Sequence, residues 1–425
     1  MSFMDFNKIC VVGLGYIGLP TAATFASYGV EVVGVDVNSK VVEALNEGKV
    51  IIEEPDLDEM VLKAVQSGKL RASLKAESAD AFIIAVPTPI TEDKKADMTY
   101  VKAAAESIVP YLKAGDIVIL ESTSPTGTVE ELMCPILEKS GLKLGEELFV
   151  GHSPERVLPG QILKELIYNN RLVGGINRVS AEKIRDLYKI FVKGEIYLTT
   201  ATTAEMCKMM ENTFRDVNIA LANELAKLCE NLGINAWEVI NLCNKHPRVN
   251  LHLPGPGVGG HCLAVDPWFI IEKDPETAKI IELGRRTNDS MPAHVLKRIK
   301  EIKKENAISD DLKVTVLGIT YKPDIDDMRE SPIMELIGML EEEKINFSVF
   351  DPHVENYHKN EKNIADACES SDILVLGVNH KQFKELPLES IYNVMRSKVV
   401  FDTRNFLNKS QVEDFGFKYY LLGSK

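Results

Sequence analysis

The feature that most constrains the fold is an apolar strand that runs into a glycine-rich turn and then into a helix. Residues 8–12 read KICVV, residues 13–18 read GLGYIG, and residues 21–28 are rich in helix formers. A second apolar strand, residues 30–36, follows directly. This strand–turn–helix–strand order predicts the first unit of a doubly wound parallel α/β sheet.

The glycine run also predicts a ligand. Gly13 permits a tight turn, Gly15 lets the backbone approach a pyrophosphate, and Gly18 lets helix and strand pack closely. Asp36 ends the second strand about 20 residues further on, where a carboxylate would bind adenosine ribose hydroxyls. Because this carboxylate would repel a 2′-phosphate, the pattern favours NAD over NADP. The alternative is a strand–turn–helix without a ligand, and glycines and acid together argue against it.

The rest of the chain shows the same alternation on both sides of a helical centre. Strand patterns recur at 79–86, 117–120 and 147–150, and again at 313–318, 346–351, 372–378 and 398–402. Between them, residues 202–245 contain almost no proline or glycine, which predicts one long helix and a shorter one. We therefore expect two Rossmann-like doubly wound domains, 1–199 and 301–425, joined by a central helical region, 200–300. The long helix favours a homodimer, and the charge-rich stretch 297–305 is expected to be a solvated helix.

Charge and hydropathy exclude several functions. The 425 residues carry a net charge of −14, which disfavours general binding to nucleic acid or to an anionic membrane. No apolar run reaches the roughly 20 residues that span a bilayer. The first residues lack a signal-peptide pattern, so a soluble cytoplasmic protein is expected. The seven cysteines are widely spaced without C-x-x-C, so neither a disulfide framework nor a metal site is expected.

One cysteine differs from the other six, which are expected to pack as small apolar residues. Residues 246–262 read HPRVNLHLPGPGVGGHC, too rich in proline and glycine for helix or strand. Such a loop lets backbone N–H groups approach a ligand, and it ends at Cys262. If Cys262 begins a helix, the helix N-terminus favours its thiolate, and Asp266 lies one turn on. A buried structural cysteine is the alternative.

Positive and polar residues offer candidate anion contacts. Lys208, Asn212 and Arg215 are four and three residues apart in the long helix and share one face. A solvated face is the simple interpretation, although a lysine and an amide on a rigid helix also suit proton transfer and oxyanion binding. Further positive residues lie in loops, and a site that gathers several would hold a diphosphate. These are Arg156, Arg248, Lys322, Arg329 and Arg404.

The motifs together resemble the UDP-glucose/GDP-mannose dehydrogenase family over essentially the whole chain. In order they read VVGLGYIGLP, AVPTP, ESTSPTGT, SPERVLPG, EMCKMMENTFRDVNIALANELA, PGPGVGGHCLAVDPWF, GITYKPDIDDMRESP and FDTRN. The resemblance implies an NAD-binding domain, a helical dimerisation centre and a UDP-binding domain. It also implies a four-electron oxidation of a sugar C6 alcohol to a carboxylate with two NAD+, in the synthesis of a cell-surface polysaccharide or glycan precursor.

The resemblance also implies roles for single residues. Cys262 would attack the intermediate aldehyde, while Lys208 or a water held by Asp266 handles the alcohol proton. Glu155 or Asp266 would serve as base for thioester hydrolysis, Lys208 and Asn212 would stabilise oxyanions, and Thr123 would hold the catalytic water. Residues expected near NAD are Gly13, Gly15, Tyr16, Ile17, Gly18, Asp36, Thr88, Thr128 and Arg329. Residues expected at the nucleotide sugar are Arg156, Val157, Lys208, Asn212, Arg215, His246, Arg248, Gly259, Tyr321, Lys322 and Arg404.

The cysteine loop narrows the expected sugar. Glucose enzymes of the family carry a loop like GFGGSCFPKD, whereas GVGGHCLAVDPWF resembles the N-acetylhexosamine branch. Within that branch it is closer to enzymes for UDP-N-acetyl-D-mannosamine than to those for UDP-N-acetylglucosamine, and this choice rests on resemblance alone. UDP-N-acetylglucosamine or UDP-glucose oxidation is the alternative. More distant ones are a two-electron hydroxyacid-type dehydrogenase, which needs no cysteine, and a non-catalytic nucleotide-sugar sensor.

Overall fold

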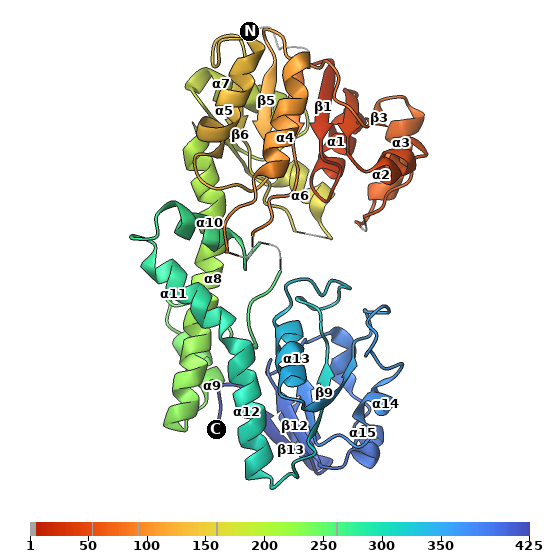
Figure 1. Cartoon of the computed structure of the whole chain (residues 1–425), viewed down its shortest axis with the longest axis vertical. Coiled ribbons are helices and arrows are strands. Elements are labelled where there is room, and N and C mark those ends of the chain that lie inside the picture. The colour runs from red at the N-terminus through yellow and green to blue at the C-terminus, as the bar shows by residue number, and fades with distance from the viewer. Residues whose placement is uncertain (1–5, 53, 92, 159, 261) are drawn as a thin grey trace. The chain divides into compact units, whose positions relative to one another are not determined.

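The protein is described by a computed structural model that covers residues 6–52, 54–91, 93–158, 160–260 and 262–425 (Figure 1). The chain divides into two compact units. Unit 1 comprises Met1–Glu211 and Trp268–Lys273, and unit 2 comprises Asn212–Pro267 and Asp274–Lys425.

Unit 1 is built on an eight-stranded sheet of order β3-β2-β1-β4-β5-β6-β7-β8. Alternate residues of β1 enter two different hydrophobic clusters, Ile9 and Val11 on one face, Cys10 and Val12 on the other, because strand side chains alternate. Helices therefore cover both faces. The strands are β1 Lys8–Val12, β2 Glu31–Val35, β3 Leu70–Ser73, β4 Ala81–Ile84, β5 Ile117–Leu120, β6 Phe149–His152, β7 Arg171–Gly175 and β8 Ile196–Thr200. The helices of this unit before α8 are α1 Gly18–Ser27, α2 Ser39–Asn46, α3 Leu57–Gln66, α4 Thr99–Ile108, α5 Cys134–Leu137, α6 Ile162–Tyr168 and α7 Arg178–Tyr188.

The predicted parallel arrangement is wrong at one pair of strands. All neighbours are parallel except β6 and β7, which pair antiparallel through Gly151 with Gly175 and His152 with Gly174. The strands approach closely there, since a Cβ on Gly151 would lie 2.2 Å from the carbonyl oxygen of Gly174. Glycines at the contact thus permit a reversal that helix–strand alternation did not indicate.

The helical centre has the predicted long helix followed by a shorter one. α8 spans Ala201–Leu232 and carries residues of both units. It ends before Gly233, whose φ of 71° lies in the left-handed region that glycine adopts without strain. Asn235 then caps α9, Ala236–Cys243, by accepting from the N–H of Trp237 at 2.9 Å. The remaining helices here are α10 Asp266–Lys273, α11 Lys279–Asp289 and α12 Met291–Glu305.

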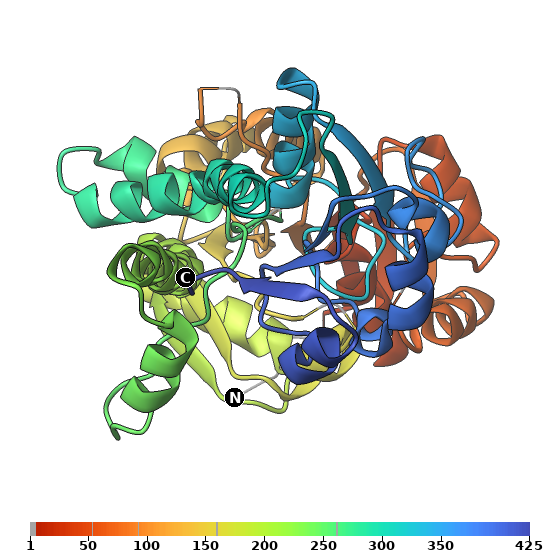
Figure 2. The same cartoon turned by 90° about the horizontal axis from the view of Figure 1, so that it is seen from below.

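Unit 2 contains a second, entirely parallel sheet of order β10-β9-β11-β12-β13. Hydrophobic clusters cover both of its faces, and helices flank it on both sides (Figure 2). The predicted α/β class with two doubly wound sheets and a helical centre is confirmed, while the three predicted domain boundaries stay a prediction. The strands are β9 Lys313–Leu317, β10 Asn346–Phe350, β11 Ile373–Leu376, β12 Val399–Asp402 and β13 Lys418–Leu421. The helices are α13 Pro332–Glu342, α14 Ile364–Cys368, α15 Leu388–Val394 and α16 Lys409–Asp414.

Candidate functional site

The glycine turn after β1 has the geometry of a dinucleotide cradle. A Cβ on Gly13 would lie 2.5 Å from the Ala85 oxygen, and one on Gly18 would lie 1.8 Å from the Gly13 oxygen. A Cβ on Gly15, by contrast, would have no atom within 4 Å, so this position opens to a ligand. The turn therefore needs two glycines for closure and leaves the middle one free to approach phosphates.

Asp36 directly follows β2, the position at which a dinucleotide-binding fold carries the acid that binds the ribose. Its Oδ2 accepts from the Leu14 N–H at 3.0 Å and its Oδ1 from the Asn38 N–H at 2.9 Å. These bonds fix a half-buried carboxylate beside the glycine turn. The residues present fit NAD, and a 2′-phosphate would meet the charge of this carboxylate.

The other residues expected near NAD in unit 1 lie after strands β1, β4 and β5, in loops or, for Thr128, at the first residue of the short π-helix η2, Thr128–Met133. Thr88, after β4, donates its hydroxyl to the Thr123 carbonyl after β5 at 2.6 Å. Thr128 is buried and donates to the Pro125 carbonyl at 2.6 Å. Tyr16 is exposed and Ile17 half-buried. Arg329 lies in unit 2, where Nε and Nη2 of its guanidinium donate to Asp327, and its predicted place near NAD stays a prediction.

Glu205 of α8 is a residue that the sequence reasoning missed. Its carboxylate is fully buried and accepts from the N–H of Gly127 at 2.5 Å and of Val129 at 2.9 Å. It thereby fixes the turn that carries Thr128. Burial raises the pKa of Glu205 to about 7, partly opposed by the two N–H donors. No local pattern marks this acid, because its partners lie more than seventy residues away.

Glu155 is the outer member of a buried charged network. Its Oε2 lies 2.5 Å from Nη2 of Arg171, whose Nη1 lies 3.4 Å from Oε1 of Glu121. The Tyr188 hydroxyl donates to Glu121 at 2.6 Å, and the Arg171 guanidinium lies 4.2 Å from the centre of the Tyr188 ring. Burial raises the pKa of Glu121, and Arg171 opposes the shift. Arg171, Glu121 and Tyr188 were not among the predicted site residues.

The remaining predicted residues of unit 1 are placed as follows. Arg156 is held by Glu211 at 2.8 Å and by the Asn170 carbonyl at 2.6 Å. Val157 packs against the hydrophobic core. Lys208 is half-buried on α8. Its positive charge, together with the larger effect of burial, lowers the pKa of His152 to about 3.

In unit 2, the cysteine turn precedes α10. Cys262 is exposed, and its carbonyl accepts from the N–H of Val265 at 3.0 Å and of Asp266 at 2.8 Å. The helix begins at Asp266, so Cys262 does not itself begin it. Asp266 is buried and accepts from the Asn212 amide at 2.5 Å, which unites the predicted amide and carboxylate beside the cysteine turn.

The other cysteines are only partly as expected. Cys10, Cys229 and Cys368 are buried, and Cys134 and Cys207 are half-buried. Cys243, at the end of α9, is exposed, so the expectation that it packs in a core is wrong. Residues 241–250, which are the last three residues of α9 and the seven after it, are all exposed, so no element covers this end of the helix in the described chain.

The glycine loop before Cys262 packs against predicted nucleotide contacts. A Cβ on Gly259 would lie 2.2 Å from the Glu330 oxygen, and one on Gly260 would lie 2.8 Å from the Tyr321 ring. A Cβ on Gly255 would lie 2.7 Å from Nη1 of Arg404. The loop thus needs glycines because Tyr321 and Arg404 approach its backbone directly.

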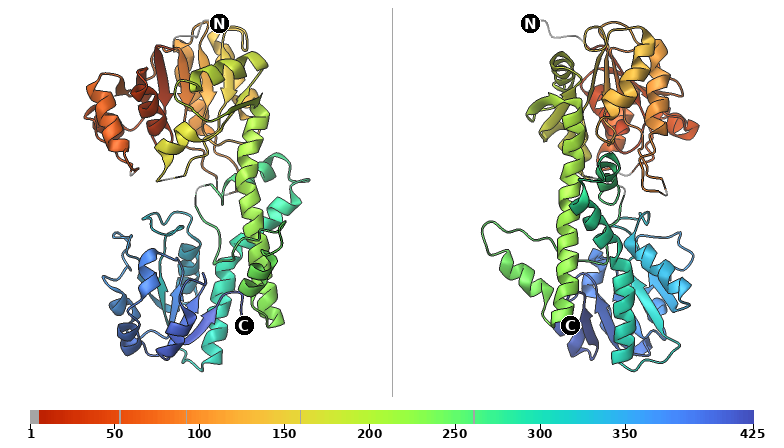
Figure 3. Two further views of the ribbon diagram at one scale, coloured as in Figure 1. Left: turned by 180° about the vertical axis from the view of Figure 1, so that it is seen from behind. Right: turned by 60° about the vertical axis from the view of Figure 1, so that its left-hand side comes forward.

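Arg404 is the positive group that the structure holds most firmly here. Its Nε donates to the Gly377 carbonyl at 3.0 Å. Burial lowers its pKa to about 10, partly opposed by Asp402, so it stays protonated at neutral pH. Lys322 is exposed, as are Arg215, His246 and Arg248. The last two follow α9, which stands away from α8 (Figure 3).

A histidine cluster at the carboxyl ends of β9, β10 and β11 does not suit a metal. Candidate ligand atoms of Asp324, His353 and His380 lie within 4.8 Å of one another. However, Nδ1 of His380 accepts from the Asp324 N–H at 2.9 Å, so the proton of the neutral ring is on Nε2. Nε2 lies 3.0 Å from the Asp351 carboxylate and donates to it. A metal needs the lone pair that this proton occupies.

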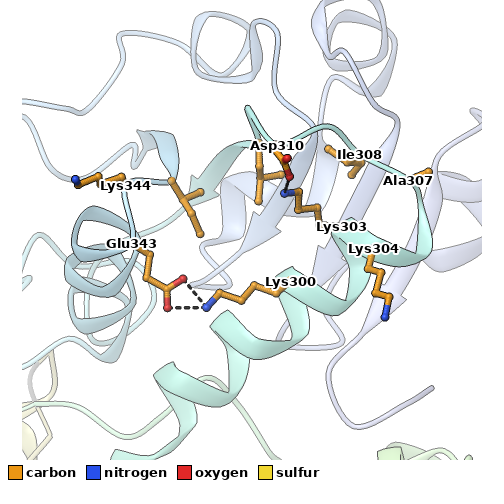
Figure 4. Close-up of a pocket in the computed structure, with 10 residues that line it drawn as sticks. Lys300, Lys303, Lys304, Ala307, Ile308, Asp310, Glu343 and Lys344 are labelled. Atoms are coloured by element: carbon orange, nitrogen blue, oxygen red, sulfur yellow. Dashed lines mark hydrogen bonds and ion pairs between the residues drawn. The ribbon is translucent and has the colours of Figure 1, made fainter.

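A hollow of about 670 Å³ lies between the ends of α12 and α13 (Figure 4). Lys300 pairs with Glu343, and Lys303 pairs with Asp310 at 2.8 Å. Lys304 also lines the hollow. Carboxylates neutralise two of its cations, and two helix C-termini oppose an anion. The stretch 297–305 is helical as expected, but it is only partly solvated, because Arg298, Ile299 and Ile302 are buried. No ligand is assigned to the hollow.

Among the helices of the described ranges, none is long and apolar enough to cross a membrane. The fold and the glycine cradle define the class of protein as an NAD-dependent dehydrogenase with a second nucleotide-binding unit. More specifically, the chain belongs to the UDP-glucose/GDP-mannose dehydrogenase family. Residues 7–192 match its NAD binding domain, 202–290 its central domain and 315–409 its UDP binding domain.

Relatives match over nearly the whole chain. A "UDP-N-acetyl-D-mannosamine dehydrogenase" of Methanococcus maripaludis is 47% identical over 99% of this chain and 98% of its own. An "NDP-N-acetyl-D-galactosaminuronic acid dehydrogenase" of Ralstonia solanacearum is 46% identical over 94% of this chain and 96% of its own. The solved structure of the UDP-N-acetyl-mannosamine dehydrogenase Cap5O from S. aureus superposes with a TM-score of 0.89, at 48% identity, covering 98% and 99% of the two chains. The expected family is confirmed.

Proposed function

We propose that the chain oxidises C6 of UDP-N-acetyl-D-mannosamine to the uronate with two NAD+. The main support is the turn at Cys262, beside which the Asn212 amide is hydrogen-bonded to Asp266. In addition, the chain is similar to a UDP-N-acetyl-D-mannosamine dehydrogenase over 99% of its length. A two-electron dehydrogenase would need no such thiol. NAD supplies the acceptor for two hydrides, one in each oxidation.

The first oxidation requires removal of the C6 hydroxyl proton as hydride leaves carbon. Lys208 or a water held by Asp266 takes this proton, giving an aldehyde, one NADH and one proton. The Asn212 amide, held by Asp266 at 2.5 Å, donates to the developing oxyanion together with the Lys208 ammonium. These roles follow the family pattern and are supported by the half-buried position of Lys208 on α8.

In the second oxidation the Cys262 thiolate adds to the aldehyde carbon, and the resulting oxyanion takes up a proton to give a thiohemiacetal. Loss of its C–H hydride to a second NAD+ and of its O–H proton leaves a thioester. Water, positioned by Thr123, then cleaves the C–S bond, with Glu155 or Asp266 accepting its proton, and releases the carboxylate and the thiol. The Glu155 carboxylate forms an ion pair with Arg171 at 2.5 Å, which fixes its position.

The nucleotide moiety is assigned to unit 2. Arg404 remains charged next to the glycine loop, and the Tyr321 ring lies against Gly260. We place the pyrophosphate and uridine at these groups with Gly259 and Lys322. The further contacts that the family pattern supplies are Arg156, Val157, Arg215, His246 and Arg248. Positive groups at this loop hold an anionic ligand although the chain as a whole carries −14.

The test is NADH yield and product identity with four sugars. UDP-N-acetylmannosamine, UDP-N-acetylglucosamine, UDP-glucose and UDP-galactose are each supplied in limiting amount with excess NAD+. We expect about two NADH per UDP-N-acetylmannosamine and the highest kcat/KM for it. A yield of one NADH contradicts the four-electron reaction. A higher kcat/KM for UDP-N-acetylglucosamine contradicts the choice of epimer.

A cysteine pair provides a matched test of the nucleophile. Cys262→Ser should abolish carboxylate formation and leave UDP-sugar affinity within about twofold. Cys243→Ser removes the other exposed thiol and should have no effect on either quantity. Uronate formation at the normal rate by Cys262→Ser contradicts covalent catalysis.

We also propose that the chain works as a homodimer. Phe214, Leu221 and Leu228 recur every seven residues on α8 and are 62%, 51% and 49% exposed, forming an apolar stripe in the described chain. A second copy that pairs along α8 would cover it. Light scattering should give twice the chain mass, and Leu221→Glu with Leu228→Glu should give a monomer. A monomeric mass for the wild-type chain contradicts the proposed dimer.

The expected cytoplasmic location stays a prediction.

A further inference from the structure

The cysteine loop is tied at its start to a buried asparagine of α8. The Gly255 N–H donates to Oδ1 of Asn223 at 2.9 Å, and Asn223 has no exposed surface. A Cβ at Gly255 would lie 2.7 Å from Nη1 of Arg404, so this backbone position must be a glycine to keep its bond to Asn223. The amide of Asn223 is therefore an anchor for the loop rather than part of a solvated helix face.

The same asparagine leads into a buried network between α8 and α11. Nδ2 of Asn223 donates to Oδ1 of Asn288 at 2.8 Å, and Nδ2 of Asn288 donates to Oδ1 of Asp216 at 2.8 Å. Arg285 pairs with Asp216 at 2.5 Å. All four side chains are fully buried. Breaking one of these buried bonds is costly because it leaves a polar group unpaired, although Oδ2 of Asp216 and Nε of Arg285 themselves have no hydrogen-bond partner within the described residues.

The network returns to the loop immediately after the cysteine. Nη1 of Arg285 donates to the carbonyl of Leu263, the residue next to Cys262, at 3.4 Å. Two residues of one connected network thus bind the segment on both sides of the thiol. Asp266, bound to Asn212, provides a third attachment from α8. Apart from Asp266 and Asn212, the buried groups that set the direction of the turn around Cys262 do not belong to the proposed catalytic set.

We propose that Asn223, Asn288 and Arg285 are positioning residues that fix the segment from Gly255 to Asp266 and so aim the Cys262 thiol at its substrate. The inference rests on the proposed function for the role of the thiol. A misplaced nucleophile lowers the rate of the chemical step without lowering the affinity for ligands bound elsewhere. A substitution that frees the loop should therefore also lower kcat.

The test combines hydrogen exchange with steady-state kinetics on the full chain. Asn223→Ala leaves the Gly255 N–H without its acceptor, so amide exchange in residues 255–266 should become about tenfold faster. The kcat for uronate formation should fall about tenfold, with KM for NAD+ within about twofold. Asn218→Ala is the matched control, because Asn218 lies on the same helix and, within the described residues, its side chain donates only to the Phe214 carbonyl. It should change neither exchange nor kcat.

Two results would overturn the proposal. Faster exchange with normal kcat shows that loop anchoring does not matter for the thiol. Reduced kcat with normal exchange shows that Asn223 acts elsewhere. Asn223→Ser repeats the test with a polar side chain if the alanine variant fails to fold. If the wild-type chain turns over no UDP-sugar, the proposed function is contradicted instead. The hydrogen-exchange rates then still test whether Asn223 anchors the loop, because they do not depend on turnover.

Discussion

Replacement of Glu205 by glutamine tests how burial and the NAD-side turn are coupled. The Glu205 carboxylate accepts two backbone N–H groups in a fully buried position, and its pKa rises from 4.5 to about 7. The folded chain therefore binds this proton more tightly than the unfolded chain. The resulting stabilisation is fully present below pH 4.5 and is lost as the pH rises through about 7.

The magnitude follows from the two pKa values. At about 1.4 kcal/mol per pKa unit, the rise corresponds to ~3 kcal/mol over the whole range, of which ~2.5 kcal/mol falls between about pH 5 and pH 8. Glutamine cannot titrate, so the variant should lack this part of the pH dependence. Urea unfolding at the two pH values measures it as a difference between wild type and variant.

The control is Glu224→Gln, which changes an exposed glutamate on the same helix and should follow the wild-type pH dependence. If the Glu205→Gln and wild-type free energies of unfolding change in parallel between the two pH values, the reasoning is refuted. Glutamine also offers one oxygen to two N–H donors, so the Thr128 turn should loosen. We expect KM for NAD+ to rise about threefold to tenfold.

Three further predictions concern single side chains. Asp36→Ala should weaken NAD+ binding about tenfold in calorimetric titration, because it removes the ribose acid and the acceptor of the Leu14 N–H, and unchanged affinity would contradict the assignment. Gly260→Ala places a Cβ 2.8 Å from the Tyr321 ring at a φ of 90°. The substitution should lower the free energy of unfolding in urea by about 1–3 kcal/mol and raise KM for the UDP-sugar. An unchanged free energy of unfolding would contradict the close packing of Tyr321 on Gly260. Arg171→Leu removes the cation between the carboxylates of Glu121 and Glu155 and should lower the free energy of unfolding by about 3–5 kcal/mol. The decrease should be larger at pH 8 than at pH 5. A decrease that is the same at both pH values would contradict the charged network.

Local patterns predicted the elements that local forces decide. The strand and glycine turn at β1 were placed correctly because apolar content, turn residues and the acid at Asp36 all lie within one short segment. α8 and α9 were predicted from the absence of glycine and proline, with Gly233 marking the break. The reversal at β7 was not predicted, because it depends on two glycines in distant strands meeting at a close contact.

Contacts between distant segments account for the parts of the site that were missed. Arg171 looks like a surface charge at the start of a strand, and only the fold shows that two carboxylates and an aromatic ring enclose it. Asn223 and Arg285 lie in ordinary helical sequence, and their bonds reach residues 32 and 22 positions away. A buried polar network has no sequence period, because its members need only meet in space.

The two sheets also show why one fold binds different ligands. Asp36 and Asp351 each follow the second strand of their unit and accept the N–H two residues on, at 2.9 Å in both cases. Each also accepts the N–H of the residue that follows the glycine after the first strand, Leu14 at 3.0 Å and Ile319 at 2.7 Å.

Their surroundings differ in a way that decides their use. Asp36 is half-buried and keeps capacity for a ribose hydroxyl, whereas Asp351 is 2% exposed and accepts a further bond from Nε2 of the buried His380. The ring nitrogen opposite holds the Asp324 N–H, so the histidine cannot swing away without losing two bonds. A ribose diol therefore has an acid to bind in unit 1 and meets an occupied one in unit 2. The second Rossmann-like sheet would then hold its nucleotide by other groups, and Arg404 and Tyr321, which lie against the glycine loop, are the groups that we propose for this role.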